Sequence, residues 1–408
     1  MPRRHEIPVK EAVEAPDSIT YPLILLFATA VGAIIMNLFA AQTQVGLVAS
    51  SLHMSRADSG LVAMAPLLGY AAGLFFLVPL ADLMENRRLV VAMIGGAALM
   101  AAGVALAKRA DMVLVLLFAL GAASSAIQVL VPIAASMAAE HRRGRVIGDV
   151  MSGLMIGILL ARPFASGIAS AFGWRAFYVA SAALMTVLAL VLGFRLSVRR
   201  PVQRQSYGRL IVSLWHLLRD EPVLRRRSLL AALVMAAFSL FWTAIALRLA
   251  QPPFDYTQRG IAIFALVGVG GAIATPLSGR WGDRGWTRKA TVGAHLATIG
   301  AFLLIVWAGA AAQTTQYLAL VGFGLGAVIL DMGVTSDQTL GRRLINLLQP
   351  EARGRINGLF VGIFFLGGAV GSATAGFAWA SGGWPLVCLT GIGFAVLCLL
   401  VDVTMGAG

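Results

Sequence analysis

Runs of about twenty consecutive apolar residues recur along nearly the whole chain, and they constrain its fold more than any other feature. A run of that length spans the hydrocarbon core of a bilayer as an α-helix, which satisfies every backbone N–H and C=O group internally. The 408-residue sequence contains twelve runs that we expect to span a membrane. They cover residues 21–43, 60–83, 88–107, 112–138, 147–172, 175–195, 228–250, 261–281, 289–311, 317–340, 356–381 and 385–404.

The composition agrees with a chain embedded in lipid. Hydrophobic residues make up 59% of the sequence, charged residues only 12%, and the mean hydropathy is +0.84. A soluble protein of this size carries about 25% charged residues. The chain is therefore expected to be an integral membrane protein.

A formal net charge of +14 raises the alternative of nucleic-acid binding, and the placement of the basic residues argues against it. With the amino terminus in the cytoplasm, about 25 of the 32 Lys and Arg residues fall in cytoplasmic segments and about five outside. Two fall within spans, Arg162 and Arg248, the latter near an outer end from which its side chain can reach the interface. This asymmetry is the positive-inside pattern, so we expect both termini in the cytoplasm and no nucleic-acid partner.

The longest polar segment divides the chain into two halves of six spans each. The expected divisions are a cytoplasmic tail at 1–20, a six-helix bundle at 21–195, a linker at 196–227, a second six-helix bundle at 228–404 and a tail at 405–408. Within the linker, "GRLIVSLWHLLRDEP" carries leucines at helical spacing and polar residues on the other side, which predicts an amphipathic helix. The leucines are Leu210, Leu214, Leu217 and Leu218, and the polar residues are Arg209, Ser213, His216 and Asp220. Such a helix lies on the inner membrane surface or packs as a linker without a binding role, and we favour the second interpretation.

The two halves repeat one another. "VPLADLMENRR" and "GRWGDRGWTRK" each end the second span of their half with an aspartate followed by a basic pair, and "EHRRGRVIG" (140–148) corresponds to "EARGRINGL" (351–359). Carboxylates and arginines at helix ends can pair in one conformation and separate in another. We therefore interpret these residues as a conformational latch, with simple positive-inside anchoring as the alternative. They are Asp82, Arg87, Arg88, Asp283, Arg288, Lys289, Glu140, Arg145, Glu351 and Arg355.

On these paired motifs the chain resembles the major facilitator superfamily over essentially its whole length. The segments "NLFAAQTQ", "VPLADLMENRR", "GILLAR" and "DEPVLRRR" are similar to a bacterial branch of efflux permeases. The resemblance implies an all-α membrane protein with twelve transmembrane helices in two pseudo-symmetric six-helix bundles. It also implies transport by alternating access, a monomer, and a place in the bacterial inner membrane.

The fifth span contains "GILLARPFASG" (157–167), which is similar to the glycine–proline motif of proton antiporters in this superfamily. Pro163 is present, Gly157 and Gly167 flank it, and arginine stands where the motif has glycine before the proline. We interpret the segment as a variant of that motif, with a helix irregularity at Pro163 that frees the carbonyl near Leu159.

Arg162 itself needs a polar partner, because an arginine at mid-membrane costs about 2.5–3.5 kcal/mol even on insertion scales. The acidic candidates within spans are Asp331, Asp337 and Asp149, of which Asp331 lies nearest mid-membrane and in the opposite half. Our hypothesis is a charge pair between Arg162 and Asp331 across a central cavity, either directly or through substrate and water. The alternative gives each residue a structural partner within its own half.

A carboxyl group in a membrane can also carry a proton, because burial favours its neutral form and a nearby cation favours its charged form. A substrate that displaces one member of the pair would change the proton affinity of the other. Many proton-coupled relatives have an arginine in the fourth span where this chain has Leu117 in "LLFALG". Either Arg162 replaces that arginine, or the protein is a facilitator without coupling.

Further polar and aromatic residues fall on the first, fourth and seventh spans, which line the cavity in this superfamily. Taken one at a time, such residues more often make interhelical hydrogen bonds than substrate contacts. As candidate cavity residues we add Asn37, Gln42, Gln128 and Trp242, alongside the polar Ser124 and Ser125. His295 in the ninth span is expected to be structural.

These features predict a proton-coupled antiporter that exports a small amphipathic or aromatic compound. The alternatives are proton-coupled uptake of a small organic anion through Arg162 and Asp331, or an uncoupled facilitator. A non-transporting receptor is disfavoured because the loops are too short for a sensory domain. No nucleotide-binding loop or metal-ligand cluster is present in the sequence, so we expect no enzyme activity, cofactor or metal.

Overall fold

The computed structural model describes residues 19–200, 206–349 and 352–405 of the chain. Most of both predicted tails, and Glu351 of the predicted latch, lie outside these residues. The long helices of the first half are α1 (Tyr21–Ser51), α2 (Leu61–Phe76), α3 (Asn86–Leu106), α4 (Ala110–Ser124), α5 (Ile127–Ser136), α6 (Arg143–Phe172) and α7 (Trp174–Arg195). After α8 (Tyr207–Asp220) follow α9 (Pro222–Leu249), α10 (Gln258–Ala265), α11 (Ala274–Asp283), α12 (Thr287–Ala311), α13 (Gln316–Ile345) and α14 (Arg353–Thr404). The 3₁₀ helices are η1 (Asp58–Gly60), η2 (Val78–Asp82), η3 (Glu140–Arg142) and η4 (Leu266–Ile273).

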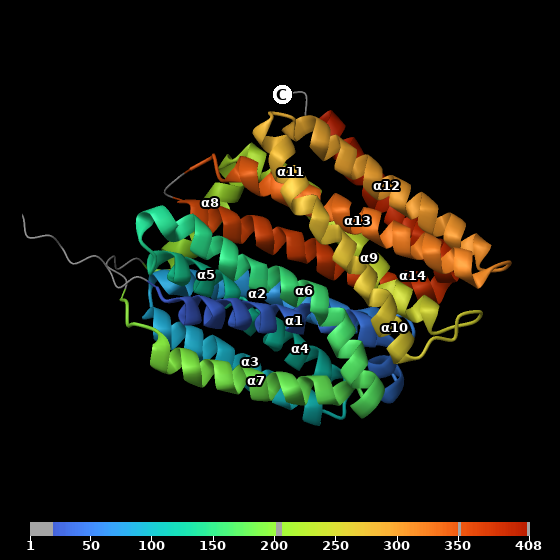
Figure 1. Ribbon diagram of the computed structural model, residues 1–408, viewed down its shortest axis with the longest axis horizontal. Coiled ribbons are helices and arrows are strands. Elements are labelled where there is room, and N and C mark those ends of the chain that lie inside the picture. The colour runs from blue at the N-terminus through green and yellow to red at the C-terminus, as the bar shows by residue number, and fades with distance from the viewer. Residues whose placement is uncertain (1–18, 201–205, 350–351, 406–408) are drawn as a thin grey trace, which may run out of the picture.

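The helices form two bundles that lie side by side, as Figure 1 shows, with α1–α7 in one and α9–α14 in the other. The amphipathic α8 lies at one end of the molecule, which we call the α8 end, and the opposite end is the far end. The expected fold class, an all-α membrane protein with two pseudo-symmetric six-helix bundles, is confirmed.

The last helix accounts for two of the twelve spans. Eleven helical segments in the described part of the chain are long and apolar enough to cross a membrane, and α14 is 52 residues long. At about 1.5 Å per residue, a single helix of that length would be more than twice as long as the bilayer core is thick. Gly383 (φ 60°, ψ −151°) interrupts α14, and Pro385 follows it, so the eleventh and twelfth spans meet there.

Two other spans are broken into shorter helices. The fourth changes from α4 to α5 after Ser124, whose hydroxyl donates to the Leu120 carbonyl instead of to another helix. The eighth passes from α10 through η4 into α11. The η4 segment contains "VGVGGA", which has little α-helix propensity because glycine loses much backbone freedom on folding. The first span shows the opposite deviation: α1 continues to Ser51, beyond the predicted residue 43, since its apolar sequence does not stop there.

Glycines let α1 and α6 pack closely in the first bundle. A Cβ atom at Gly157 would collide with the Gly32 carbonyl oxygen, and one at Gly153 with that of Ala28. Gly167 has open space on the corresponding side. The helix α6 runs unbroken through Pro163, so the irregularity expected at the proline does not take the form of a break.

The linker helix contacts both bundles. Leu210, Leu214 and Leu217 are buried, as the predicted amphipathic pattern requires, while Leu218 is half-buried. The Tyr207 hydroxyl donates to the Phe76 carbonyl of α2 at 2.8 Å, and other contacts of α8 reach α14.

Candidate functional site

A cavity of about 640 Å³ lies between the two bundles. The first half contributes residues of α1, α2, α5 and α6, and the second half residues of α9, η4, α13 and α14. Arg162 and Asp331 line its deep part, while Gly148 at the start of α6 and Arg342 near the end of α13 line it toward the α8 end. The cavity therefore connects the middle of the molecule with one of its two ends.

At the far end the two bundles are in contact. A Cβ at Gly60 would collide with the Ser372 carbonyl oxygen of α14, and a Cβ at Gly376 would lie 2.7 Å from the Ala57 carbonyl oxygen. On α1, a Cβ at Gly46 would lie 3.4 Å from Leu247 of α9. These close approaches shut the path between the bundles on the side away from α8.

Arg162 projects from α6 into a ring of aromatic side chains. Only 3% of its surface is exposed, and its Nε donates to Oε1 of Gln42 at 2.9 Å. Its guanidinium carbon lies 5.2 Å from the ring centre of Phe39, 5.0 Å from that of Phe238 and 4.4 Å from that of Trp242. Distances below about 6 Å are attractive, because the face of an aromatic ring carries negative charge. Phe238 and Trp242 belong to the second half, so these contacts cross between the halves.

Asp331 of α13 is held from the other side by Trp242. The indole Nε1 donates to Asp331 Oδ1 at 2.9 Å, and the carboxyl-bearing residue is 7% exposed. The glycine-rich η4 makes room for it, because a Cβ at Gly271 would collide with the Asp331 Cβ and one at Gly268 would lie 3.2 Å from Oδ2.

Arg162 and Asp331 thus share one cavity and one neighbour, Trp242, whose ring faces the cation and whose N–H binds the carboxylate. Among the described residues, no nitrogen–oxygen distance of 4 Å or less joins the two charged groups. Each hydrogen-bond partner, Gln42 and Trp242, lies in the same half as the group it binds. The geometry combines parts of both hypotheses: local hydrogen bonds, with aromatic contacts across the cavity.

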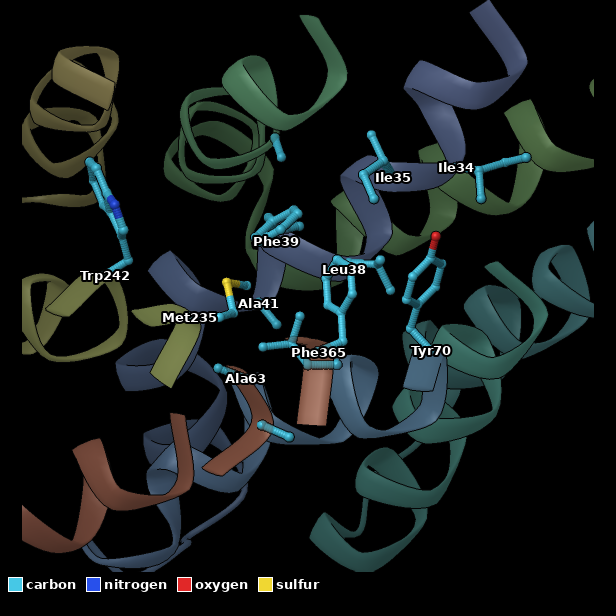
Figure 2. Close-up of a cluster of buried hydrophobic side chains, with 14 of the residues drawn as sticks. Ile34, Ile35, Leu38, Phe39, Ala41, Ala63, Tyr70, Met235, Trp242 and Phe365 are labelled. Carbon is cyan, nitrogen blue, oxygen red and sulfur yellow. The ribbon is translucent and has the colours of Figure 1, made fainter. Parts of the chain in front are cut away.

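Aromatic residues from the two halves alternate beside this site. Phe365 lies 4.6 Å from Tyr70 and 6.2 Å from Phe39, measured between ring centres, and Phe39 lies 6.5 Å from Phe238. Figure 2 shows Phe39 and Phe365 close to Met235, with Tyr70 on one side and Trp242 on the other. Beside this site the two bundles therefore meet through aromatic rings.

The other predicted cavity residues lie in different surroundings. Gln128 lines the cavity and its Nε2 donates to the Tyr70 hydroxyl at 3.3 Å. Asn37 is not among the residues that line the cavity, and its Oδ1 accepts from the Ser181 hydroxyl of α7 at 2.6 Å inside the first bundle. Gln42 and Trp242 are not among the lining residues either, but both contact Arg162. Asp149, considered as a partner of Arg162, is exposed on α6.

Sequence reasoning missed several cavity residues, most importantly Arg342. Its position in "GRRL", at the end of a span, is typical of a positive-inside charge and does not by itself indicate a cavity residue. In the structure Arg342 lines the cavity, and within the described residues its buried Nε has no hydrogen-bond partner. Gly268 and Gly271 were also missed, although the glycine cluster around them was a visible signal of close approach.

The described members of the predicted latch, all except Glu351, lie at the α8 end and form several separate contacts. Asp283 pairs with Arg343 of α13. Arg87 and Arg88 both pair with Glu85, at 3.6 and 3.4 Å, in the first half. Arg355 donates to the Ser213 hydroxyl of α8 at 2.9 Å. The remaining members of the set are Asp82 at the end of η2, Glu140 in η3, Arg145 in α6, and Arg288 and Lys289 at the start of α12.

The second bundle contains a buried charge cluster that the sequence did not indicate. Asp337 Oδ1 lies 3.0 Å from Nη2 of Arg227 and 3.2 Å from Nε2 of His295. Asp402 Oδ2 lies 3.4 Å from the other ring nitrogen of His295, and Asp402 Oδ1 lies 2.6 Å from Nη2 of Arg226. The cluster joins α9, α12, α13 and α14, and within it His295 connects the carboxylates of Asp337 and Asp402.

Comparison with known proteins identifies transporters as similar chains. Residues 25–345 match the family model described as Major Facilitator Superfamily. The chain is 36% identical over 385 residues to "Uncharacterized transporter YgaY" of Escherichia coli O157:H7, which covers 93% of this chain and 94% of that protein. It is 32% identical over 377 residues to "Probable transporter SCO4007" of Streptomyces coelicolor, with coverage of 92% and 85%.

Solved structures with a similar fold are also transporters. A bacterial homolog to the human lysosomal transporter Spinster, in an inward-facing and occupied conformation, superposes with a TM-score of 0.69 at 16% identity and covers 94% of this chain and 96% of that chain. The nucleoside transporter NupG superposes with a TM-score of 0.73 at 14% identity, with coverage of 94% and 99%. At these identities the likeness concerns the fold alone.

Proposed function

The chain belongs to the major facilitator superfamily and is a membrane transporter, and from this premise we propose that it exports a small amphipathic or aromatic compound in exchange for protons. It would do so by alternating access from the bacterial inner membrane, as a monomer. The supporting observation is that Arg162 and Asp331 line one cavity between the bundles and that the buried Trp242 contacts both of them.

The lining of the cavity suits such a substrate. Most of the lining residues are apolar, and among them are Met151, Met155 and Met235 together with several phenylalanines. Methionine side chains are flexible and polarizable, so they adapt to flat ligands of different shape. The few polar groups would orient the polar end of the compound.

Coupling would follow from the shared position of Trp242. A flat substrate that stacks among Phe39, Phe238 and Trp242 must shift the rings that surround Arg162. Because Trp242 also donates to Asp331, the same shift changes the hydrogen bonding of that carboxylate. Substrate occupancy and proton occupancy of Asp331 would then be linked, and the linkage acts equally in both directions.

The distribution of Lys and Arg supports a cytoplasmic α8 end, and with that orientation this conformation would be inward-facing. A transition to the outward-facing state would require the far-end contact between Gly60 and Ser372 to open. At the α8 end, the pair of Asp283 with Arg343 and the contact of Arg355 with α8 would change as the bundles rock. This is the role we propose for the latch residues.

A second candidate function, uptake of a small organic anion with protons, is favoured by one observation. The cavity lining contains two arginines, Arg162 and Arg342, and a single carboxylate, Asp331. An anionic group would find two positive charges along its path and would bind more strongly than a cation of the same shape.

The experiment that tests the proposal uses purified protein in liposomes that contain a pH-sensitive dye. A proton gradient is imposed, and lipophilic cations, neutral aromatic compounds and organic acids are added in turn. We expect an aromatic or amphipathic compound to move protons in the wild type, and Asp331→Asn and Arg162→Gln to abolish that movement. Asp111→Asn, at an exposed aspartate paired with Arg109 outside the cavity, is the matched control.

The direction of proton movement separates the two functions. Protons that leave the compartment into which the compound is driven indicate exchange, whereas protons that accompany the compound indicate symport. Transport without any proton movement, unchanged in Asp331→Asn, would contradict both and would leave an uncoupled facilitator.

A further inference from the structure

A second cavity lies at the far end, separate from the central one. It has a volume of about 830 Å³ and is formed by the ends of α9 and α12, the interruption in α14, and Arg56 from the connection after α1. Its floor includes Gly309, where a Cβ would lie 2.7 Å from Nε1 of Trp384. The absence of a Cβ at this glycine therefore lets the Trp384 indole pack closely against α12.

The polar groups around this cavity are mainly donors. Arg56, Arg248 and Trp384 line it together with the amides of Gln251 and Gln313, and no aspartate or glutamate is among its lining residues, all of which are described. Trp384 is 8% exposed, and among the described residues its buried Nε1 has no hydrogen-bond partner. A buried donor without a partner destabilises the empty site, and the net charge of the lining is positive. This chemistry matches an anion.

The donor groups of this cavity adjoin apolar side chains on the outer surface of the second bundle. Val306 of α12 and Leu389 of α14 line the same cavity and are 43% and 64% exposed. In a membrane-spanning chain, exposed apolar side chains on the outer faces of helices contact lipid chains. A ligand here would thus have its charged group among arginines and its apolar part among lipid-facing side chains.

We propose that this far-end cavity binds the phosphate headgroup of an anionic phospholipid. Its phosphate accepts hydrogen bonds from Arg248 and the Trp384 N–H, and its acyl chains lie along Val306 and Leu389. Arg248 is already oriented for this: its Nη1 donates to the Pro252 carbonyl at 2.7 Å and its guanidinium lies 5.0 Å from the Phe254 ring centre, which fix its position and leave other N–H groups for the ligand.

The site also connects the two halves. Arg56 belongs to the first half and Arg248 to the second, and both line the cavity only while the far ends of the bundles touch. A bound phosphate attracts both arginines, so it favours the conformation that is closed at the far end and open toward α8. The lipid would therefore shift the conformational equilibrium of the transporter without entering the central cavity.

The test measures lipid binding to the purified full-length chain in detergent. Short-chain phosphatidylglycerol, short-chain phosphatidylcholine and inorganic phosphate are titrated separately, with bound lipid detected by native mass spectrometry and thermal stability recorded in parallel. We expect phosphatidylglycerol to bind and to raise the unfolding temperature, and phosphatidylcholine to bind at least about tenfold more weakly. Arg248→Gln and Trp384→Phe should each weaken phosphatidylglycerol binding, while Arg259→Gln, at an exposed arginine of α10 outside the cavity, should not.

Arg56→Gln changes an exposed residue and keeps the test valid if a substitution at Arg248 prevents folding. In the wild type, added phosphatidylglycerol should slow hydrogen exchange in residues 53–62. In Arg56→Gln it should not. Equal binding of phosphatidylglycerol and phosphatidylcholine, or binding that persists unchanged in Arg248→Gln, Trp384→Phe and Arg56→Gln, would overturn the proposal. Displacement of phosphatidylglycerol by inorganic phosphate at similar concentration would assign the site to a soluble anion and would also overturn it.

Discussion

The buried charge cluster around His295 and the charged groups of the central cavity differ in how they are paired. In the second bundle, Arg227 and Arg226 each face a carboxylate within 3.0 Å, and His295 lies between Asp337 and Asp402. In the central cavity, the guanidinium of Arg162 contacts an amide and three aromatic rings. Among the described residues, no carboxylate oxygen lies within 4 Å of a guanidinium nitrogen of Arg162, unlike those of Arg226 and Arg227.

This difference in pairing indicates which charged groups can exchange partners without disrupting a bundle. The cluster around His295 joins four helices of one bundle, so separating its charges would disrupt that bundle. Arg162 and Asp331 lie where the two bundles meet, and neutral groups that a substrate or water can replace surround them. In the proposed alternating-access cycle, strong pairing would thus accompany the bundle that moves as a rigid body, and weak pairing the cavity that rearranges.

The largest effect on stability is expected from Asp337→Ala. Removing this carboxylate leaves Arg227 buried and unpaired, a change that typically costs about 3–5 kcal/mol. The unfolding temperature in detergent should fall sharply, and the yield of folded protein with it. An unfolding temperature like that of the wild type would mean that the cluster does not hold the second bundle together.

Asp331→Asn should instead affect proton movement more than stability. Asparagine keeps an oxygen that accepts from the Trp242 N–H, so we expect the folded protein to persist with a much smaller loss of stability than in Asp337→Ala. Substrate-driven proton movement in liposomes should fall at least about tenfold, equivalent to about 1.4 kcal/mol. If both variants lose stability to the same degree, the distinction between the two charge groups is wrong.

Trp242→Phe sharpens the comparison within the cavity. Phenylalanine retains an aromatic face for Arg162 and removes the N–H that binds Asp331. A stacked aromatic pair is worth about 0.5–1.5 kcal/mol, so we expect the KM for an aromatic substrate to rise by about two- to twelvefold in Trp242→Ala and by less in Trp242→Phe. Equal KM values in the two variants would show that the ring does not contribute to substrate binding.

The smallest effect on stability is expected at the exposed pair of Asp283 and Arg343. Solvent-exposed ion pairs contribute about 0–1 kcal/mol, so Asp283→Asn should leave the unfolding temperature nearly unchanged. If the pair acts as a latch, the transport rate should nevertheless change, while Asp111→Asn, at an exposed aspartate paired with Arg109, should leave it constant. A transport rate equal to that of the wild type would reduce Asp283 to an anchoring role.

The sequence by itself determined the features that depend on length and composition. Runs of about twenty apolar residues predict spans whatever their neighbours are, and the anomaly of Arg162 in an apolar run is visible without any structure. The amphipathic linker helix was predictable for the same kind of reason, because one of its faces is polar and the other is not.

The tertiary structure alone decided which way each span faces. In a soluble helix the polar face indicates the outside, but a span that contacts lipid on one side and protein on the other is apolar on both, so hydropathy does not define its rotation. Asn37 turns to Ser181 rather than to the cavity, and Arg342 turns into the cavity rather than to the surface, although neither choice alters the pattern of the sequence. The meeting of Trp242 with both Arg162 and Asp331 joins residues far apart in the chain, and only the packing of three helices brings them together.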